Sequence, residues 1–127
     1  KEGPGSPPPW RNALTLPQSI DPSELHYHLA KFECACEPCD IKAGAVHLES
    51  TLELYGVPDN WDDIASFYLE AIEDMPEDIL IKTLKHVRLN CKWFPKPSEI
   101  RDQIPPEWGE RIETMFLLRR MKSKSID

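Results

Sequence analysis

The sequence predicts an all-α protein, a compact bundle of five to six short helices that follows a flexible N-terminal arm. Apolar residues recur at steps of three and four along most of the chain, whereas no stretch alternates with period two for long enough to suggest a strand. Prolines and capping residues divide these stretches into short segments. The length of 127 residues, with 40% hydrophobic and 29% charged residues, fits one folded domain with a loose end.

The arm is expected to cover residues 1–18, which are rich in Pro and Gly and have little periodic pattern. Residues 19–122 are expected to form a single helical domain, and residues 123–127 a polar tail. The run Gly3-Pro4-Gly5-Ser6 resembles the scar of a protease cleavage site, so we expect the natural N-terminus to be missing. Trp10, Leu14 and Leu16 are the apolar residues with which the arm could anchor its end on the domain.

The first two helices are predicted from their caps and apolar stripes. The first begins at Asp21-Pro22, because aspartate caps a helix and proline suits its first turn, and it ends near Glu33. Its apolar stripe consists of Leu25, Leu29 and Phe32. The apolar stripe of the second helix consists of Ile41, Ala45, Leu48, Leu52 and Tyr55. Gly56 and Pro58 then end this helix.

The third helix begins after Asp59 or Asn60, and its acidic residues are expected to face water. Its expected buried residues are Trp61, Ile64, Ala65, Tyr68, Ile72 and Met75. A tight junction at Met75-Pro76 leads into the fourth helix. The apolar stripe of that helix consists of Leu80, Leu84, Val87 and Cys91.

The run Trp93-Phe94-Pro95-Lys96-Pro97 ends the fourth helix, because each proline lacks an amide donor and restricts the residue before it. We expect both aromatic residues to hold this elbow in the core. A short helix follows from about Pro97 to Gln103, and Pro105-Pro106 breaks the chain again. The last helix, from Glu107 to about Lys122, is expected to bury Trp108, Ile112, Met115 and Phe116. The apolar residues that it is expected to expose are Leu117, Leu118 and Met121.

The net charge of −7 is unevenly distributed along the chain. Residues 59–78 include eight acidic residues and no Lys or Arg, whereas the C-terminus is basic. An acidic surface repels phosphate backbones, so we expect nucleic acid to be contacted only indirectly or through the basic tail. The acidic strip could be a docking face for a basic protein surface, or a solvated helix face that keeps the protein soluble.

A set of residues between about 48 and 104 forms a recognisable pattern. It consists of Tyr55, Trp61, Tyr68, the junction Asp74-Met75-Pro76, and the run from Trp93 through Phe94-Pro95-Lys96-Pro97-Ser98-Glu99-Ile100. This pattern resembles that of phage and prophage replication proteins related to the replicative helicase loader and inhibitor family. The segment that contains the cysteines is not part of this resemblance.

The resemblance implies a small, non-enzymatic adaptor that binds a hexameric replicative DNA helicase and either loads or inhibits it in phage or prophage DNA replication. The residues expected to bind the partner are Asp62, Asp63, Glu70 and Asp74 on the acidic helix face, and Arg119 and Arg120 at the basic end. One alternative is an acidic inhibitor that mimics nucleic acid against a host DNA-binding enzyme. Another is a zinc-stabilised module that binds nucleic acid through its basic tail.

Three cysteines, Cys34, Cys36 and Cys39, lie within six residues, and so short a turn could direct their sulfur atoms at a tetrahedral Zn²⁺ ion. Cys91 could supply the fourth ligand from the end of another helix. The alternative fourth ligands are His26, His28 and His47. The expected cofactor is therefore either none or one structural zinc ion. In the competing interpretation the cysteines are free, and Cys91 is a small buried hydrophobic residue.

Several functional classes are not expected. The sequence has no nucleophile-elbow serine and no glycine-rich loop for phosphates, and its acidic residues fall on the outer face of a helix rather than in a cleft. We therefore expect no enzyme. No apolar run is long enough to span a bilayer, so no membrane association is expected. Four cysteines without a secretion signal favour a reducing compartment, and we expect a cytoplasmic protein.

Overall fold

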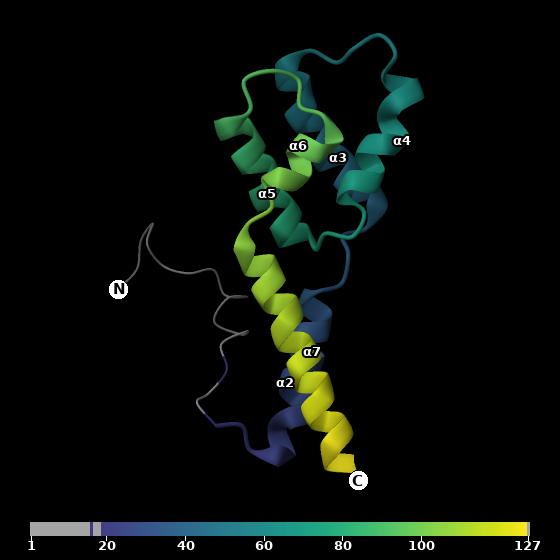
Figure 1. The fold of residues 1–127 in the computed structure, drawn as a ribbon. Helices are drawn as coiled ribbons and strands as arrows, with labels where there is room; N and C mark the ends of the chain where they lie inside the picture. Colours follow the sequence, from purple (N-terminus) through teal and green to yellow (C-terminus); the bar gives the residue numbers. More distant parts are fainter. Residues whose placement is uncertain (1–15, 17–18, 127) are drawn as a thin grey trace, which may run out of the picture. The chain divides into compact units, whose positions relative to one another are not determined.

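A computed structural model describes residues 16 and 19–126 of the chain (Figure 1). Within this part of the chain there are six α-helices, two short 3-10 helices and no strand, which confirms the all-α prediction. The elements are η1 (Pro22–Glu24), α2 (Leu25–Ala35), α3 (Ile41–Leu52), η2 (Glu53–Tyr55), α4 (Trp61–Ile72), α5 (Glu77–Asn90), α6 (Pro97–Asp102) and α7 (Pro106–Ile126). The predicted N-terminal arm, apart from Leu16, lies outside the described residues.

The chain divides into two compact units. Unit 1 combines the chain up to Cys36 with the segment from Glu110 onward, and unit 2 is the continuous segment Glu37–Gly109. The helix α7 therefore contributes its first four residues to unit 2 and the rest to unit 1. That the chain forms one domain stays a prediction. The helix α7 continues to Ile126, beyond its predicted end near Lys122.

Unit 1 is a pair of helices, α2 and the later part of α7, which lie side by side (Figure 1). Their contact is a single apolar cluster of Leu25, Leu29, Phe32, Met115 and Leu118, with Leu16, Ile20 and Cys36 partly buried against it. Arg111 is also buried, and its guanidinium donates to the carbonyl oxygen of Ala35 at 2.8 Å. This bond satisfies an acceptor that the C-terminus of α2 would otherwise leave open.

Unit 2 places α3, α4, α5 and α6 around a second apolar core. The helix α3 packs against α4 and α5, and α6 packs against the same two helices. The most deeply buried side chains of this core are Leu48, Leu52, Ile72, Met75, Ile79, Leu80, Leu84, Val87 and Ile100. Asp40 caps α3 by accepting a hydrogen bond from the amide of Ala43 at 3.2 Å. The stripes predicted for the second, third and fourth helices therefore supply most of this core.

Tyr55 secures the C-terminus of α5. Its hydroxyl oxygen lies 2.8 Å from the carbonyl oxygen of Cys91 and 3.1 Å from that of Val87. The last carbonyl groups of a helix have no partner within the helix, so a hydroxyl from another element stabilises the helix end. In this way the 3-10 turn that follows α3 is tied to the start of the elbow between α5 and α6.

The elbow itself is held by an aromatic cluster of Trp61, Tyr68 and Phe94. The ring of Phe94 stands edge-on to those of Trp61 and Tyr68, at centroid distances of 6.3 and 5.8 Å. The buried hydroxyl of Tyr68 donates to the carbonyl oxygen of Pro95 at 2.8 Å. Edge-to-face pairs of this kind add stabilisation beyond the area that they bury. These residues all belong to the sequence pattern described above, so much of that pattern fixes the elbow against α4.

Four side chains differ from their predicted exposure. Trp93 is 75% exposed, although it was expected in the core beside Phe94. Ile41 is 47% exposed because it lies in the first turn of α3, beyond the core. On α7 the prediction was wrong for two residues, since Phe116 is exposed and Leu118 is fully buried. The buried stripe of α7 follows Arg111, Met115 and Leu118, at steps of four and three.

Replacing Gly56 with alanine is expected to destabilise unit 2 by about 1–2 kcal/mol, because Gly56 has a positive φ of 85° that L residues rarely adopt. Gly109→Ala is the matched control, and it is expected to raise the stability rather than lower it. Gly109 lies within α7, where an added Cβ meets no atom of the described residues within 4 Å, so alanine should stabilise by about 0.5–1 kcal/mol. Urea denaturation followed by circular dichroism measures both. Equal effects of the two substitutions would contradict the assigned backbone conformations.

Candidate protein-interaction site

The outer face of α4 carries most of the predicted binding residues. Asp62, Asp63, Glu70 and Asp74 are all exposed, and Glu73 is exposed beside them. At 3.6 residues per turn Asp62, Asp63 and Glu70 fall on one half of the helix surface, while Tyr68, Ala71 and Ile72 are buried on the other half. Glu73 and Asp74 directly follow the last residue of the helix. Asp62 and Asp63 lie in the first turn, where their negative charges are favoured by the helix dipole. The structure thus brings the four predicted acidic residues together on one surface, which we call the acidic face.

Only one of these four carboxylates is engaged in an ion pair among the described residues. Oδ1 of Asp74 accepts a hydrogen bond from Nη1 of Arg101 at 2.7 Å, and Arg101 also donates to the carbonyl oxygen of Ala71 at 3.1 Å. This pair connects the end of α4 to α6. Asp62, Asp63 and Glu70 make no such pair with the rest of the described chain, so their charge is available to a partner.

Phe67 lies within the acidic face and is 59% exposed. The sequence does not identify Phe67 as an exposed residue, because a single phenylalanine does not show which side of the helix faces the core. An exposed aromatic ring surrounded by carboxylates combines apolar contact area with charge. Interfaces often combine a central aromatic anchor with a polar rim.

The aromatic cluster gives the acidic face a rigid support. Trp61 begins α4, packs on Tyr68 at 5.2 Å between ring centroids, and its indole nitrogen donates to Glu49 on α3 at 3.4 Å. Buried Tyr68 ties the same helix to the elbow. The helix is therefore held on both the α3 side and the α6 side, and the carboxylates project from a fixed backbone.

The basic end of the chain lies on α7, in unit 1. Nε of Arg119 donates to Oε2 of Glu33 at 2.9 Å, and its guanidinium carbon lies 5.5 Å from the centroid of the Phe116 ring. Arg120 is exposed and makes no ion pair within the described residues. Of the two predicted binding arginines, Arg119 therefore joins α7 to α2. The charge of Arg120 is not neutralised by an ion pair among the described residues.

The four cysteines have different surroundings. Cys34 and Cys36 belong to unit 1, where Cys34 is exposed and Cys36 follows the end of α2. Cys39 and Cys91 belong to unit 2. Within the described part of the chain, no three His, Cys, Asp or Glu side chains are grouped in a way that could hold a metal ion. The zinc site therefore stays a prediction, with no support from the arrangement of these side chains.

Burial raises the pKa of the Cys39 thiol above its ordinary value, with Glu77 and Asp40 adding to the effect. Burial likewise raises the pKa of Cys91, with Glu99 and Asp102 adding to it. A thiolate is the reactive form, and a raised pKa leaves less of it at neutral pH.

Alkylation with iodoacetamide at pH 8 is expected to modify Cys34 at least about tenfold faster than Cys39 or Cys91. Cys34 is exposed, whereas the other two thiols are partly buried and have raised pKa values that lower their thiolate fraction at this pH. Peptide mass spectrometry over time measures each rate separately. The rates of Cys39 and Cys91 should rise as the pH approaches their pKa values. Fast modification of Cys39 at pH 7 would contradict the structure.

Two other features of unit 2 could not be located from the sequence. One is exposed Trp93, whose ring lies 5.3 Å from the ammonium nitrogen of Lys92 and lines a pocket of about 230 Å³ at the elbow. The other is a groove between α3 and α5. None of the helices in the described residues is both long enough and apolar enough to cross a membrane.

The predicted acidic residues are exposed, and none of them lines the groove or the elbow pocket. No family model matches the sequence, and no curated protein or solved structure matches it either. The resemblance to the helicase loader and inhibitor family therefore stays a prediction that rests on the residues of the pattern.

Proposed function

We propose that this protein is a non-enzymatic adaptor that binds a hexameric replicative DNA helicase through the acidic face of α4, and that it loads or inhibits this helicase in phage or prophage DNA replication. The observation that carries the proposal is the composition of that face. Three carboxylates that make no ion pair among the described residues lie beside an exposed aromatic ring on a helix that is fixed from both sides. The family resemblance supplies the identity of the partner.

The pattern residues and the binding residues have separate tasks in this proposal. Trp61, Tyr68 and Phe94 hold the elbow and α4 in place. The carboxylates of the acidic face contact the partner. Charge complementarity would accelerate association and select a basic surface on the helicase, while Phe67 would supply apolar contact. Arg120 at the basic end is available for a second contact.

The test is complex formation with purified hexameric replicative helicases from bacterial hosts, measured by size-exclusion chromatography with light scattering at low and moderate salt. The expected result is co-elution with a helicase hexamer that weakens as salt is raised, because exposed charges are screened. Helicase unwinding assays then decide between loading and inhibition. Absence of any complex at low salt would overturn the proposal.

The acidic face also favours one alternative, an inhibitor that mimics the charge of nucleic acid. A pull-down from bacterial lysate separates the two functions. Retention of a replicative helicase supports the adaptor, whereas retention of a nuclease or repressor that nucleic acid displaces supports mimicry. Exposed Phe67 beside the carboxylates favours the adaptor, because a phosphate backbone presents no aromatic ring of this kind to its enzymes.

A further inference from the structure

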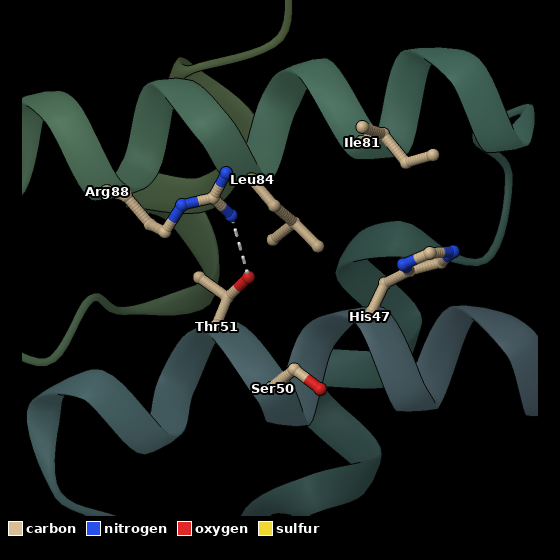
Figure 2. Close-up of a pocket in the computed structure, with 6 residues that line it drawn as sticks. All are labelled: His47, Ser50, Thr51, Ile81, Leu84 and Arg88. Carbon is tan, nitrogen blue, oxygen red and sulfur yellow. Dashed lines mark hydrogen bonds between the residues drawn. The ribbon is translucent and has the colours of Figure 1, made fainter.

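A groove runs between α3 and α5 of unit 2, away from the residues assigned above. It encloses about 240 Å³ and is lined by His47, Ser50 and Thr51 of α3 and by Ile81, Leu84 and Arg88 of α5. Figure 2 shows side chains of both helices directed into the space between them, with Leu84 and Thr51 at its inner side. Thr51 and Leu84 are 4% and 2% exposed, so the floor of the groove is part of the core.

The charged side chains at the groove that make no ion pair among the described residues are positive. Arg88 donates to the hydroxyl of Thr51 at 3.3 Å and pairs with no carboxylate among the described residues (Figure 2). Lys85, one turn earlier on α5, is exposed and has no ion pair there either. His47 is already engaged, since its Nε2 lies 3.0 Å from Oε2 of Glu77. In a chain of net charge −7, two unpaired cations beside one groove favour an acidic occupant.

Exposed apolar residues lie within one turn of residues of the groove on both sides, and one of them, Ile81, itself lines it. On the α3 side, Val46 and Leu54 lie one turn before and one turn after Ser50, and they are 63% and 69% exposed. On the α5 side, Ile81 and Leu89 lie one turn before and one turn after Lys85, and they are 46% and 69% exposed. Exposed apolar residues that gather along a groove mark binding surfaces more often than isolated ones do.

We propose that this groove binds a helix of a partner protein that presents a carboxylate between apolar side chains. A groove with an apolar floor and exposed apolar residues near it on both helices matches an amphipathic helix, which places its anchors at steps of three and four. The guanidinium of Arg88 offers two parallel donors to one carboxylate, a geometry that lysine cannot reproduce. The groove is separate from the acidic face, so the chain can contact two proteins at once. This proposal does not depend on which protein binds α4.

A nucleic acid is a poorer fit for the same surface. Its backbone would meet two cations but would leave four exposed apolar side chains without partners. A second copy of this chain is the other competing occupant, because the acidic face with Phe67 also combines carboxylates with an apolar ring. The experiment below distinguishes both from a partner helix.

The test uses a display library of helical peptides, selected on the complete chain and counter-selected on Arg88→Ala. The enriched peptides are expected to carry a Glu or Asp with Leu, Ile or Phe three or four positions away. They should bind the unmodified chain at least about tenfold more tightly than Arg88→Ala or Ser50→Trp, which places a bulky ring at the exposed edge of the groove. Lys42→Ala removes another exposed cation that makes no ion pair among the described residues, from α3, and should bind as the unmodified chain does.

Three outcomes would overturn the proposal. The first is no enrichment, or enrichment of peptides that lack an acidic residue. The second is equal loss of binding in Arg88→Ala and Lys42→Ala, or amide shifts in NMR spectra that map to α4 or α7 instead of α3 and α5. The third is self-association in sedimentation experiments that Arg88→Ala abolishes, because this result would assign the groove to a second copy. Preferential displacement of the peptides by single-stranded DNA would assign it to nucleic acid.

Discussion

Replacing Tyr68 with alanine is expected to lower the free energy of unfolding of unit 2 by about 3–5 kcal/mol, the usual range for truncating a buried aromatic residue. Tyr68 is 6% exposed and contacts the rings of Trp61 and Phe94. Its hydroxyl donates to the carbonyl oxygen of Pro95. The substitution therefore removes both the centre of the aromatic cluster and the bond that fixes the elbow. Urea denaturation followed by circular dichroism measures the loss.

Two further variants separate the contributions. Tyr68→Phe keeps the ring and leaves the Pro95 carbonyl without its hydroxyl donor, so the expected loss is about 1–2 kcal/mol. Trp93→Ala removes an aromatic residue of the same elbow that is 75% exposed, and its expected effect lies within about 0.5 kcal/mol. If Trp93→Ala destabilised as much as Tyr68→Ala, the assignment of Phe94 rather than Trp93 to the cluster would be wrong.

The ionisation of Tyr68 also affects how the free energy of unfolding changes at alkaline pH. Burial, and to a smaller extent Glu99, raises the pKa of Tyr68 above 10.0, its ordinary value. The folded protein then holds the phenolic proton more tightly than the unfolded chain does. This stabilisation is fully present below the pKa of the unfolded chain and is lost as the pH rises through the raised pKa of the folded state. Tyr68→Phe should therefore show a smaller loss of stability above pH 10, although Tyr55, whose pKa is also raised, will retain part of it.

The contrast between Trp93 and Phe94 shows which parts of the fold the sequence could predict. The repeating stripes of α3 and α5 predict buried residues such as Leu48 and Leu84, because the helical period alone determines which side chains share a face. The elbow has no such period. Trp93 and Phe94 lie in a bend between α5 and α6, and only one of the two rings enters the cluster. Which one enters depends on Trp61 and Tyr68, whose positions require the tertiary structure.

The error on α7 has a different cause. Arg111 lies in the buried stripe because its guanidinium caps the end of α2 at Ala35. A charged residue within the buried stripe interrupts the apolar pattern that indicates which side of the helix is buried. The sequence then favours Phe116 over Leu118 as the buried residue. The sequence also did not predict the groove between α3 and α5. The residues on each side of it look like ordinary exposed positions until the packing of the two helices against each other is known.

The acidic face was predictable because it depends on one helix alone. The sequence places Asp62, Asp63 and Glu70 opposite the apolar stripe of α4, and the structure finds them exposed there. Phe67 was not predicted as part of that face, since its exposure depends on how far the neighbouring helices cover α4. A surface formed by one helix follows from periodicity, whereas a surface between two helices does not.

Reversing two charges on the acidic face, with Asp62→Lys and Asp63→Lys together, is expected to weaken binding to the helicase at least about tenfold. Both carboxylates are exposed and make no ion pair among the described residues, so the change acts on the partner. Most of the loss should appear as slower association at low salt, and it should shrink as salt is raised. Surface plasmon resonance over a salt series measures both rate constants.

Two control variants make this result interpretable. Glu110→Lys with Glu113→Lys changes the net charge by the same amount from exposed positions on α7, and it should leave the association rate within about twofold. Asp62→Asn with Asp63→Asn removes the charges without placing cations in the first turn of α4, where each lysine would cost about 0.3–1 kcal/mol through the helix dipole. The asparagine variant should show an intermediate loss of binding. If it and the lysine variant both bind the helicase as the unmodified chain does, then the acidic face serves only as a solvated surface. Binding would then have to be assigned to Arg120 or to the groove between α3 and α5.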